Sequence, residues 1–313
     1  MRQSFLNMLK AFDRALSRLY LRLAGDRPAL MVFMVHRLFP DEKAVEAGDV
    51  DPLERLTLSQ FRLFVQFFLE QGYRFVSEED LAAGLSEEGR YVMVTFDDGY
   101  ANNAEALPVM QEFGVPILLF VSSQHIREGK CFWWDVLYRE RYRQGVGPDR
   151  IVEEALQLKA LTTEAIEQKL REEFGNKAFN PEGELDRPFT EPELTSFAGE
   201  PLVTIGNHTH NHAILTSYDN EGVREQISKA QEAIEEMTGI RPRTISYPNG
   251  NYNAAICNCA REAGLRFGVT VDSRKNYLPV VAGTDKAMRL GRFILSGQGK
   301  FLEQLNLLRS DIL

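Results

Sequence analysis

RYVMVTFDDGY, residues 90–100, joins a buried strand to two adjacent carboxylates. The run from 90 to 96 is almost continuously apolar, which is typical of a parallel strand covered on both faces. Asp97 and Asp98 follow directly, and Gly99 gives the backbone the freedom that a tight turn needs. Because neighbouring residues of an extended chain point to opposite sides, we expect Asp97 and Asp98 to have different roles.

Similar apolar runs stand on both sides of this strand and alternate with helical patterns. Further strands are predicted at 29–36, at the start of 75–85, and at 115–123, 201–208, 243–248, 266–272 and 289–296. Helices are predicted at 56–73, in the rest of 75–85, and at 102–114, 220–239 and 253–264. This alternation predicts an α/β fold with a parallel sheet and right-handed crossovers. No glycine-rich dinucleotide loop follows the first strand, so we predict a distorted (β/α)7–8 TIM-like barrel rather than an open doubly wound sheet.

The pattern changes between about 124 and 200, where an aromatic-rich segment precedes polar helical sequence. No linker-like tract appears, so we predict one barrel domain over 27–313 with a helical insertion at about 124–200. Trp133 and Trp134 lie in the aromatic segment. They are candidates either for stacking on a sugar ring or for a hydrophobic cluster that anchors the insertion.

Residues 1–26 form a separate unit in this reading, an amphipathic helix. Its apolar positions run beside a series of basic residues, Lys10, Arg14, Arg18 and Arg22. Such a helix docks on its own domain, mediates self-association, or lies peripherally on an anionic membrane surface. The basic residues interrupt any apolar region of a signal peptide, and no apolar run reaches the roughly 18 residues of a membrane span.

Charge and cysteine content exclude some partners and compartments. The 313 residues carry a formal net charge of −9, and nucleic-acid partners need a basic face for their phosphates, so we expect no nucleic acid. The three cysteines do not make a disulfide framework. Together with the missing signal peptide, this predicts a cytoplasmic protein, in which the helix over 1–26 could contact the inner face of the membrane.

Reactive side chains stand at the carboxyl ends of four predicted strands. They are His36, the pair Asp97 and Asp98, His208, and Asn249 after Pro248. Catalytic residues of such barrels stand at this end. A carboxylate with two imidazoles leaves positions open for water and substrate, as a catalytic metal site requires.

GNHTHNHAIL, residues 206–215, holds three of the five histidines. An extended chain puts all three on one face, whereas a helical turn brings His208 and His212 together and turns His210 away. With the aspartates in view, we predict that the chain leaves the strand just before His208 and turns helically. His208 and His212 would then join Asp98, and His210 would not.

VTFDDGY, NHTHNH and SYPNG, in this order, resemble the polysaccharide deacetylase family, that is, the NodB homology family or carbohydrate esterase family 4. The resemblance covers about residues 29–300, including VHR at 35–37 and FWWD at 132–135. It implies a distorted (β/α) barrel that removes acetyl groups from sugars with a divalent metal. We therefore predict a metal-dependent hydrolase that removes N-acetyl groups from a cell-surface polysaccharide or a glycan precursor.

The site residues follow from the resemblance position by position. It implies that Asp97 is the general base and that the Thr209 hydroxyl steadies the histidine loop. The proline and glycine of SYPNG align with the family's third motif, which gives the backbone N–H of Asn249 to the oxyanion. The implied metal ligands are Asp98, His208 and His212. Zinc is the expected ion, and cobalt or nickel would suit the same ligands.

Two departures from the family pattern matter. The arginine that pairs with the catalytic aspartate is replaced by Ser246; Arg243 and Arg292 are candidates for the same space, and a structural ion pair is the alternative role for either. No histidine follows His212, so the late general-acid histidine is missing. The first and last strands of a closed barrel are neighbours, so we expect His36 to supply the proton, with a buried rim histidine as the alternative.

Two other functions stay open at this point. The missing arginine and general acid leave room for a metal-dependent amidohydrolase that acts on a small amide or a cyclic ureide. A non-catalytic carbohydrate-binding member of the fold is the third reading, and the intact catalytic and metal-ligand motifs disfavour it.

Overall fold

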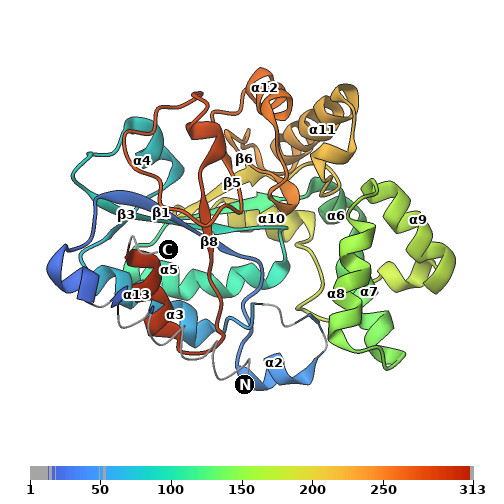
Figure 1. Cartoon of the computed structure of the whole chain (residues 1–313). Coiled ribbons are helices and arrows are strands. Elements are labelled where there is room, and N and C mark those ends of the chain that lie inside the picture. Colours follow the sequence, from blue (N-terminus) through green and yellow to red (C-terminus); the bar gives the residue numbers. More distant parts are fainter. Residues whose placement is uncertain (1–12, 14–15, 18, 49, 52–53, 311–313) are drawn as a thin grey trace.

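The computed structural model describes residues 13, 16–17, 19–48, 50–51 and 54–310, and its parallel strands form a barrel surrounded by helices (Figure 1). The strands are β1 (Ala29–Val35), β2 (Arg74–Phe75), β3 (Arg90–Phe96), β4 (Ile117–Val121), β5 (Val203–Asn207), β6 (Thr244–Ser246), β7 (Phe267–Val269) and β8 (Arg292–Ile294). Their order is β7-β6-β5-β4-β3-β1-β8, and β2 pairs with the start of β3. This confirms the predicted TIM-like (β/α) barrel.

β8 nearly closes the barrel between the first strand and the seventh. It pairs in parallel with residues 32–34 of β1. Two positions before β8, the backbone of Leu290 donates to Gly268 of β7 and accepts from Thr270 directly after β7, each at 2.8 Å. The first and last strands are therefore neighbours, as the sequence predicts, and their carboxyl ends open on the same side.

Helices cover the barrel and build the insertion. They are α2 (Glu42–Ala47), α3 (Leu58–Glu70), α4 (Glu78–Ala83), α5 (Leu107–Phe113), α6 (Ser123–Glu128), α7 (Trp133–Arg143), α8 (Pro148–Leu158), α9 (Thr163–Phe174), α10 (Glu191–Ala198), α11 (Asn220–Thr238), α12 (Ala254–Glu262) and α13 (Phe301–Arg309). Short 3-10 turns occupy η1 (Ala101–Ala106), η2 (Asn176–Phe179), η3 (Leu215–Ser217), η4 (Pro248–Gly250) and η5 (Ala287–Arg289).

α3 illustrates how the sequence specifies a barrel helix. Thr57 caps its N-terminus by accepting the backbone N–H of Gln60 at 3.3 Å. Phe64 and Phe68 recur at helical spacing and pack edge-on against Phe33 of β1, with ring centroids 4.8 and 5.2 Å apart. The apolar face of the helix thus covers the outer face of the first strand.

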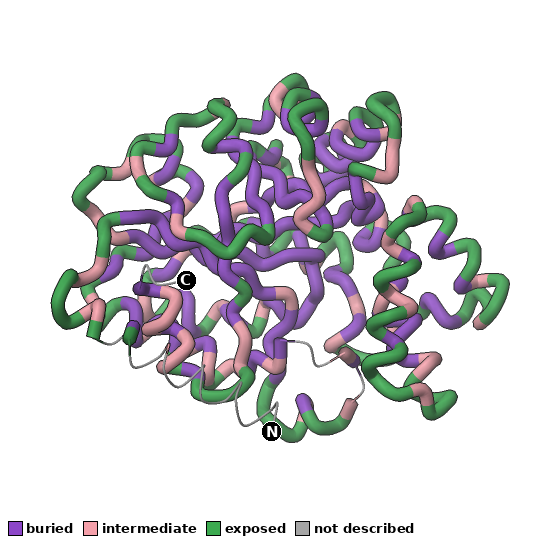
Figure 2. The backbone as a smooth tube through the Cα atoms, viewed as in Figure 1, coloured by how far each residue is buried: buried purple, intermediate pink, exposed green. Residues whose placement is uncertain are grey.

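Side-chain alternation along the strands divides the core into two parts. One set of strand residues packs outward under the helices, and the other fills the barrel interior. In Figure 2 the strands are almost entirely buried, and the exposed residues lie on the surrounding helices and loops. The barrel interior includes Leu30, Val32, Tyr91, Met93, Leu118, Phe120, Phe267 and Val269.

The segment between β4 and β5 divides into two groups of helices. α7, α8 and α9 stand beside the barrel in Figure 1 and have a core of their own, which includes Trp133, Leu137 and Leu170. α6 and α10 instead contribute to the main core, α6 with Ile126 and α10 with Leu194 and Phe197. The domain boundaries over 27–313 and about 124–200 remain a prediction.

The helix expected over residues 1–26 lies mostly outside the described residues. Within that segment, residues 19–23 are helical, and the Ser17 hydroxyl donates to the carbonyl of Asn306 at 3.1 Å. None of the helices in the described part of the chain is both long and apolar enough to cross a membrane.

Candidate active site

Asp98, His208 and His212 form a cluster of metal-ligand type at the barrel mouth. Their ligand atoms all lie within 4.8 Å of one another. Asp98 Oδ1 is 3.3 Å from His208 Nε2 and 3.4 Å from His212 Nε2. This oxygen is buried and has no hydrogen-bond partner among the described residues, a cost that a cation would remove. One carboxylate and two imidazoles therefore fit a divalent metal here.

The histidine loop reaches this arrangement without a helical turn, so the prediction of a helical turn is wrong. Residues 208–214 are irregular, and both Thr209 and His212 adopt positive φ angles, 63° and 55°. The Thr209 hydroxyl accepts the backbone N–H of Ala213 at 2.7 Å. The chain therefore reverses through two residues in the left-handed conformation, Thr209 and His212, and the Thr209–Ala213 hydrogen bond holds the turn. This replaces the helical turn that the sequence predicted.

The two ligand-type histidines have different supports, and His210 has another partner. His208 Nδ1 lies 2.8 Å from the carbonyl of Ser246, which orients its ring. His210 Nδ1 lies 2.8 Å from the hydroxyl of Ser123 at the start of α6. His210 is therefore outside the cluster.

Asp97 lies beside the cluster in a buried ion pair with Arg292 of β8. The guanidinium contacts both carboxylate oxygens, at 2.7 and 2.8 Å. The Ser246 hydroxyl donates to Asp97 Oδ2 and accepts from Arg292 Nη2, each at 2.9 Å. The arginine missing from SYPNG is thus supplied by the last strand, whereas Arg243 pairs with Glu78 at 3.1 Å.

Burial alone would raise the pKa of Asp97, but the charges around it outweigh burial. Arg292 contributes most, His208 and His36 add to it, and the pKa falls to about 2. Asp97 is therefore ionised at neutral pH. Its Oδ2 lies 3.9 Å from His208 Nε2, so the carboxylate borders the ligand cluster without belonging to it.

His36, directly after β1, is paired with Glu54, a residue that the sequence did not single out. Its Nδ1 lies 2.5 Å from Glu54 Oε1, and its backbone N–H donates to Oε2 at 2.9 Å. Burial would lower the pKa of His36, but Glu54, Asp98 and Asp97 raise it to about 10. A cation bound at Asp98 would cancel the contribution of that carboxylate to the raised pKa of His36. Glu54 would then remain the main group that keeps this pKa high. The ring is 33% exposed and can reach a substrate.

Non-glycine residues with a strained, left-handed backbone are concentrated at the candidate site. The described non-glycine residues with positive φ are Arg55, Asp98, Thr209, His212 and Asn249. Four of them belong to the candidate site or its loop, and Arg55 follows Glu54. Such conformations cost on the order of 1–3 kcal/mol each and concentrate at functional sites.

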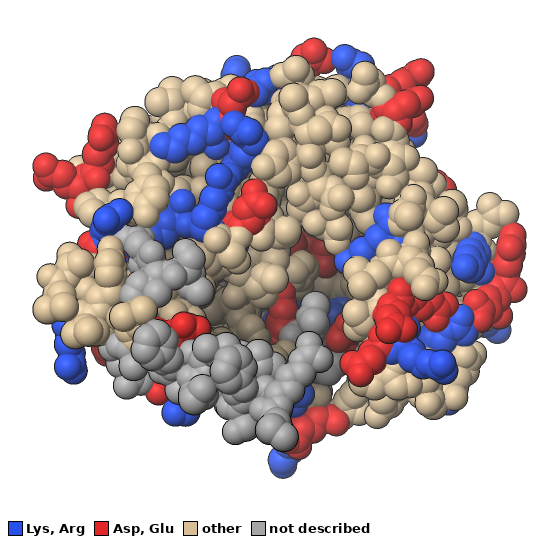
Figure 3. Space-filling view, in the orientation of Figure 1, with Lys and Arg blue, Asp and Glu red and all other residues tan. Residues whose placement is uncertain are grey.

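The insertion supplies one wall of the site. The Trp134 ring packs against His212, with centroids 4.5 Å apart and planes at 62°. The Thr163 hydroxyl donates to the His212 carbonyl at 3.3 Å. Trp133 is instead fully buried in the insertion's own core, and Trp134 packs against that core while it stays partly exposed. Figure 3 shows the surface hollowed between the barrel and the insertion, with acidic and basic side chains on its border.

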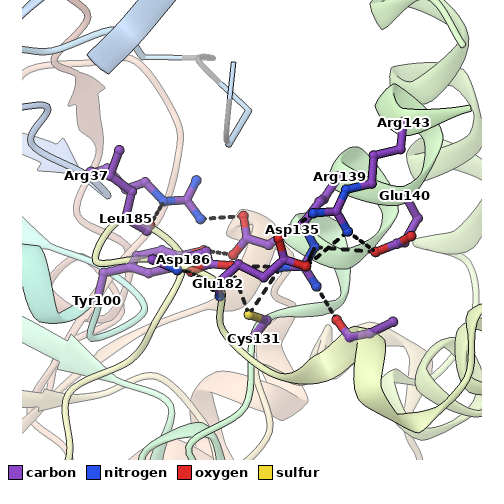
Figure 4. A network of polar contacts seen from close by, with 12 residues as sticks. Arg37, Tyr100, Cys131, Asp135, Arg139, Glu140, Arg143, Glu182, Leu185 and Asp186 are labelled. Atoms are coloured by element: carbon purple, nitrogen blue, oxygen red, sulfur yellow. Dashed lines mark hydrogen bonds and ion pairs between the residues drawn. The ribbon is translucent and has the colours of Figure 1, made fainter. Parts of the chain in front are cut away.

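A buried polar network joins this wall to the barrel (Figure 4). Arg37 pairs with Asp135 of α7 and lies over the ring of Tyr100, 4.0 Å from its centroid. The Tyr100 hydroxyl donates to Asp135 at 2.7 Å and accepts the indole N–H of Trp134 at 2.9 Å. Because Trp134 contacts His212, the network supports the ligand cluster from the insertion side.

Comparison with known sequences gives one family and distant relatives. A sequence model of the family described as polysaccharide deacetylase matches residues 85–268. The protein YxkH of Bacillus subtilis (strain 168) is 19% identical over 239 residues, which cover 75% of this chain and 63% of YxkH. The chain therefore spans less than two thirds of the length of that relative.

Two of the solved structures that match resemble most of this chain. Streptococcus pyogenes deacetylase PplD, solved in complex with acetate, has a TM-score of 0.59 at 14% identity over 90% of this chain and 98% of its own. IcaB from Ammonifex degensii has a TM-score of 0.58 at 17% identity over 91% and 98%. At these identities the likeness establishes a shared barrel fold.

Proposed function

The chain belongs to the polysaccharide deacetylase family, and from this premise we propose that it is a metal-dependent hydrolase that removes N-acetyl groups from a carbohydrate, either a cell-surface polysaccharide or a glycan precursor. The observation that carries the proposal is an ionised carboxylate, Asp97, beside a cluster of metal-ligand type. Asp97 can accept the proton of an attacking water while Asp98, His208 and His212 hold a cation.

Asp98, His208 and His212 would hold the metal. This donor set suits zinc, and cobalt or nickel would also suit it. When bound, such an ion supplies Lewis acidity, which polarises a carbonyl and lowers the pKa of water.

The remaining chemistry belongs to the side chains and the backbone. Asp97 accepts the proton of the attacking water, while Arg292 and Ser246 hold its carboxylate in one orientation. The backbone N–H of Asn249, in the turn η4, hydrogen-bonds to the oxyanion of the tetrahedral intermediate. His36, which its raised pKa keeps protonated at neutral pH, donates a proton to the departing amine.

The structure bears on the alternative of an amidohydrolase for a small amide or a cyclic ureide. That alternative arose because an arginine and a general acid were missing from the family pattern. Arg292 supplies the ion pair, and His36 is a charged histidine at the right strand end. The argument for a small amide or a cyclic ureide in place of a carbohydrate substrate is therefore weaker. A cytoplasmic location and membrane contact or self-association through residues 1–26 remain predictions.

The test is amine release by the metal-loaded protein. N-acetylglucosamine oligomers, a simple acetamide and a cyclic ureide are compared at equal concentration, with Asp97→Asn as the inactive control. We expect turnover of the sugars alone. Turnover of the amide or ureide alone would replace the proposed substrate class. A metal-loaded protein that binds the oligomers without releasing amine would support the carbohydrate-binding reading.

A further inference from the structure

Lys159 places an ammonium group at the rim of the candidate site. It is the C-cap of α8, and its Nζ lies 2.7 Å from the side-chain oxygen of Asn249. The two residues are 90 positions apart, so the contact crosses from the insertion to the barrel. Asn249 lies three positions after Ser246, whose hydroxyl contacts Asp97. The ammonium group therefore contacts the side chain of the residue whose backbone N–H is proposed to bind the oxyanion.

This ammonium has no counter-charge within the described part of the chain. No carboxylate lies within ion-pair distance of it, whereas Lys130 and Arg141 of the same insertion each contact glutamates. Lys159 is only partly exposed, and burial lowers its pKa. Water is thus partly removed from the cation while only a neutral amide oxygen replaces it.

The charged groups deeper in the site are already matched. Asp97 is paired with Arg292, and His36 with Glu54. The Asp98 carboxylate faces the place that the proposed metal ion would take. Of the three cations named here, Arg292, His36 and Lys159, Lys159 is the one without a carboxylate partner among the described residues, so a substrate can neutralise it.

The position of Lys159 is fixed by the contacts of the segment that follows it. Thr163, four positions on, donates to the carbonyl of His212 at 3.3 Å. Glu164 accepts from the side-chain amide of Asn211 at 2.5 Å. Because the start of α9 is tied to the histidine loop in this way, the turn that carries Lys159 is held beside the site.

We propose that Lys159 is a specificity-determining residue that binds an oxyanion of the substrate, so that the preferred substrate is an N-acetylated sugar bearing a phosphate or a carboxylate close to the acetamido group. The inference rests on the proposed deacetylase function and adds the substrate class. An oxyanion would accept hydrogen bonds from the Lys159 ammonium group, which now donates to Asn249, and would bring the negative charge that the protein lacks there.

The test compares three soluble sugars on the metal-loaded protein. N-acetylglucosamine 1-phosphate carries a phosphate, N-acetylmuramic acid carries a carboxylate, and methyl N-acetylglucosaminide carries neither. We expect kcat/KM for one of the anionic sugars to exceed that of the neutral glycoside by about tenfold or more. The anionic sugar with the higher kcat/KM shows whether Lys159 binds a phosphate or a carboxylate.

Variants separate charge recognition from a structural bridge. Lys159→Gln keeps a hydrogen-bond donor for Asn249 but removes the charge, and we expect the anionic-to-neutral ratio of kcat/KM to fall about tenfold. Lys159→Arg restores the charge and should retain the ratio. Lys169→Ala, an exposed lysine of α9, is the matched control. An unchanged ratio in Lys159→Gln would overturn the proposal.

The same sugars test Lys159 even if none is hydrolysed. In that outcome the deacetylase proposal fails, and calorimetric binding of the three sugars to the metal-loaded protein gives the ratio of dissociation constants instead. Tighter binding of an anionic sugar that Lys159→Gln loses would support the residue's role. Equal binding of all three would reject it.

Discussion

Arg292 and Asp97 are 195 positions apart in the sequence and form a bidentate ion pair inside the barrel, with contacts of 2.7 and 2.8 Å. Ser246 bridges the two groups. Its small side chain stands where the family pattern has an arginine, and it leaves room for the guanidinium that reaches across from the last strand. The proposed base thus keeps its charged partner, although that partner comes from a different strand.

Arg292→Lys should lower kcat/KM by about a hundredfold or more, because a point charge cannot hold both oxygens of Asp97. The substitution should also move the acid limb of the pH profile of kcat/KM. Asp97 acts only when ionised, and Arg292 is the main cause of its pKa of about 2. With that support weakened, burial raises the pKa, and activity is lost at a higher pH as the solution is acidified. An unmoved acid limb would exclude Asp97 as the titrating base.

Glu54→Gln should move the alkaline limb to lower pH. A general acid acts only when protonated, and Glu54 is the main group that raises the pKa of His36 above its ordinary value of 6.5. Without that carboxylate the proton is lost earlier as pH rises. The pH profile of kcat measures the shift, with Glu112→Gln, a surface glutamate paired to Arg62, as the control.

His36→Gln tests the same role directly. Turnover should fall about a hundredfold or more while the bound metal stays constant, since general acid catalysis typically contributes 10²–10⁴-fold. Intact turnover with metal in place would return His36 to the alternative of a structural rim histidine.

The barrel was predictable because its signals are local. Continuous apolar runs such as residues 29–36 and 90–96 indicate strands covered on both faces, and the helical periodicity of 56–73 matches the observed α3. The position of Asp97 and Asp98 follows from the same logic, because barrels present residues just after a strand at one common mouth.

Arg292 was one of two candidate partners for Asp97, but the other contacts of the site were not predictable in the same way. Glu54 lies in an irregular loop, and its pairing with His36 depends on how that loop folds back over the first strand. Lys159 and Trp134 lie in a helical insertion, whose sequence carries no signal of how it docks on the barrel. The left-handed backbone at Thr209 and His212 was not predictable either, because a β-branched threonine disfavours it and a histidine adopts it only in a small minority of cases.

Replacing His208 or His212 by Ala, or Asp98 by Asn, should abolish stoichiometric metal binding, because each removes one of the three ligands. His210→Ala should keep the metal, since that ring faces Ser123 instead. Metal per chain after gel filtration is the measurement, and chelation followed by addition of zinc, cobalt or nickel tests which ion restores turnover. Equal metal loss in His210→Ala would bring back a cluster of three histidines.

Trp134→Leu should weaken metal affinity by about 10–100-fold, the range typical of groups that orient a metal ligand. The indole packs on His212, whose Nδ1 is buried without a hydrogen-bond partner among the described residues, so ring packing is its main restraint. Trp134→Phe keeps an aromatic face toward His212 but loses part of the ring area and the N–H donated to Tyr100, so its affinity should stay within a few fold of wild type. Competition with a chelator of known affinity measures both, and thermal unfolding of the metal-free variants separates lost affinity from lost fold. If Trp134→Leu bound zinc as tightly as wild type, the insertion would be a wall of the substrate groove with no part in holding the ligand cluster.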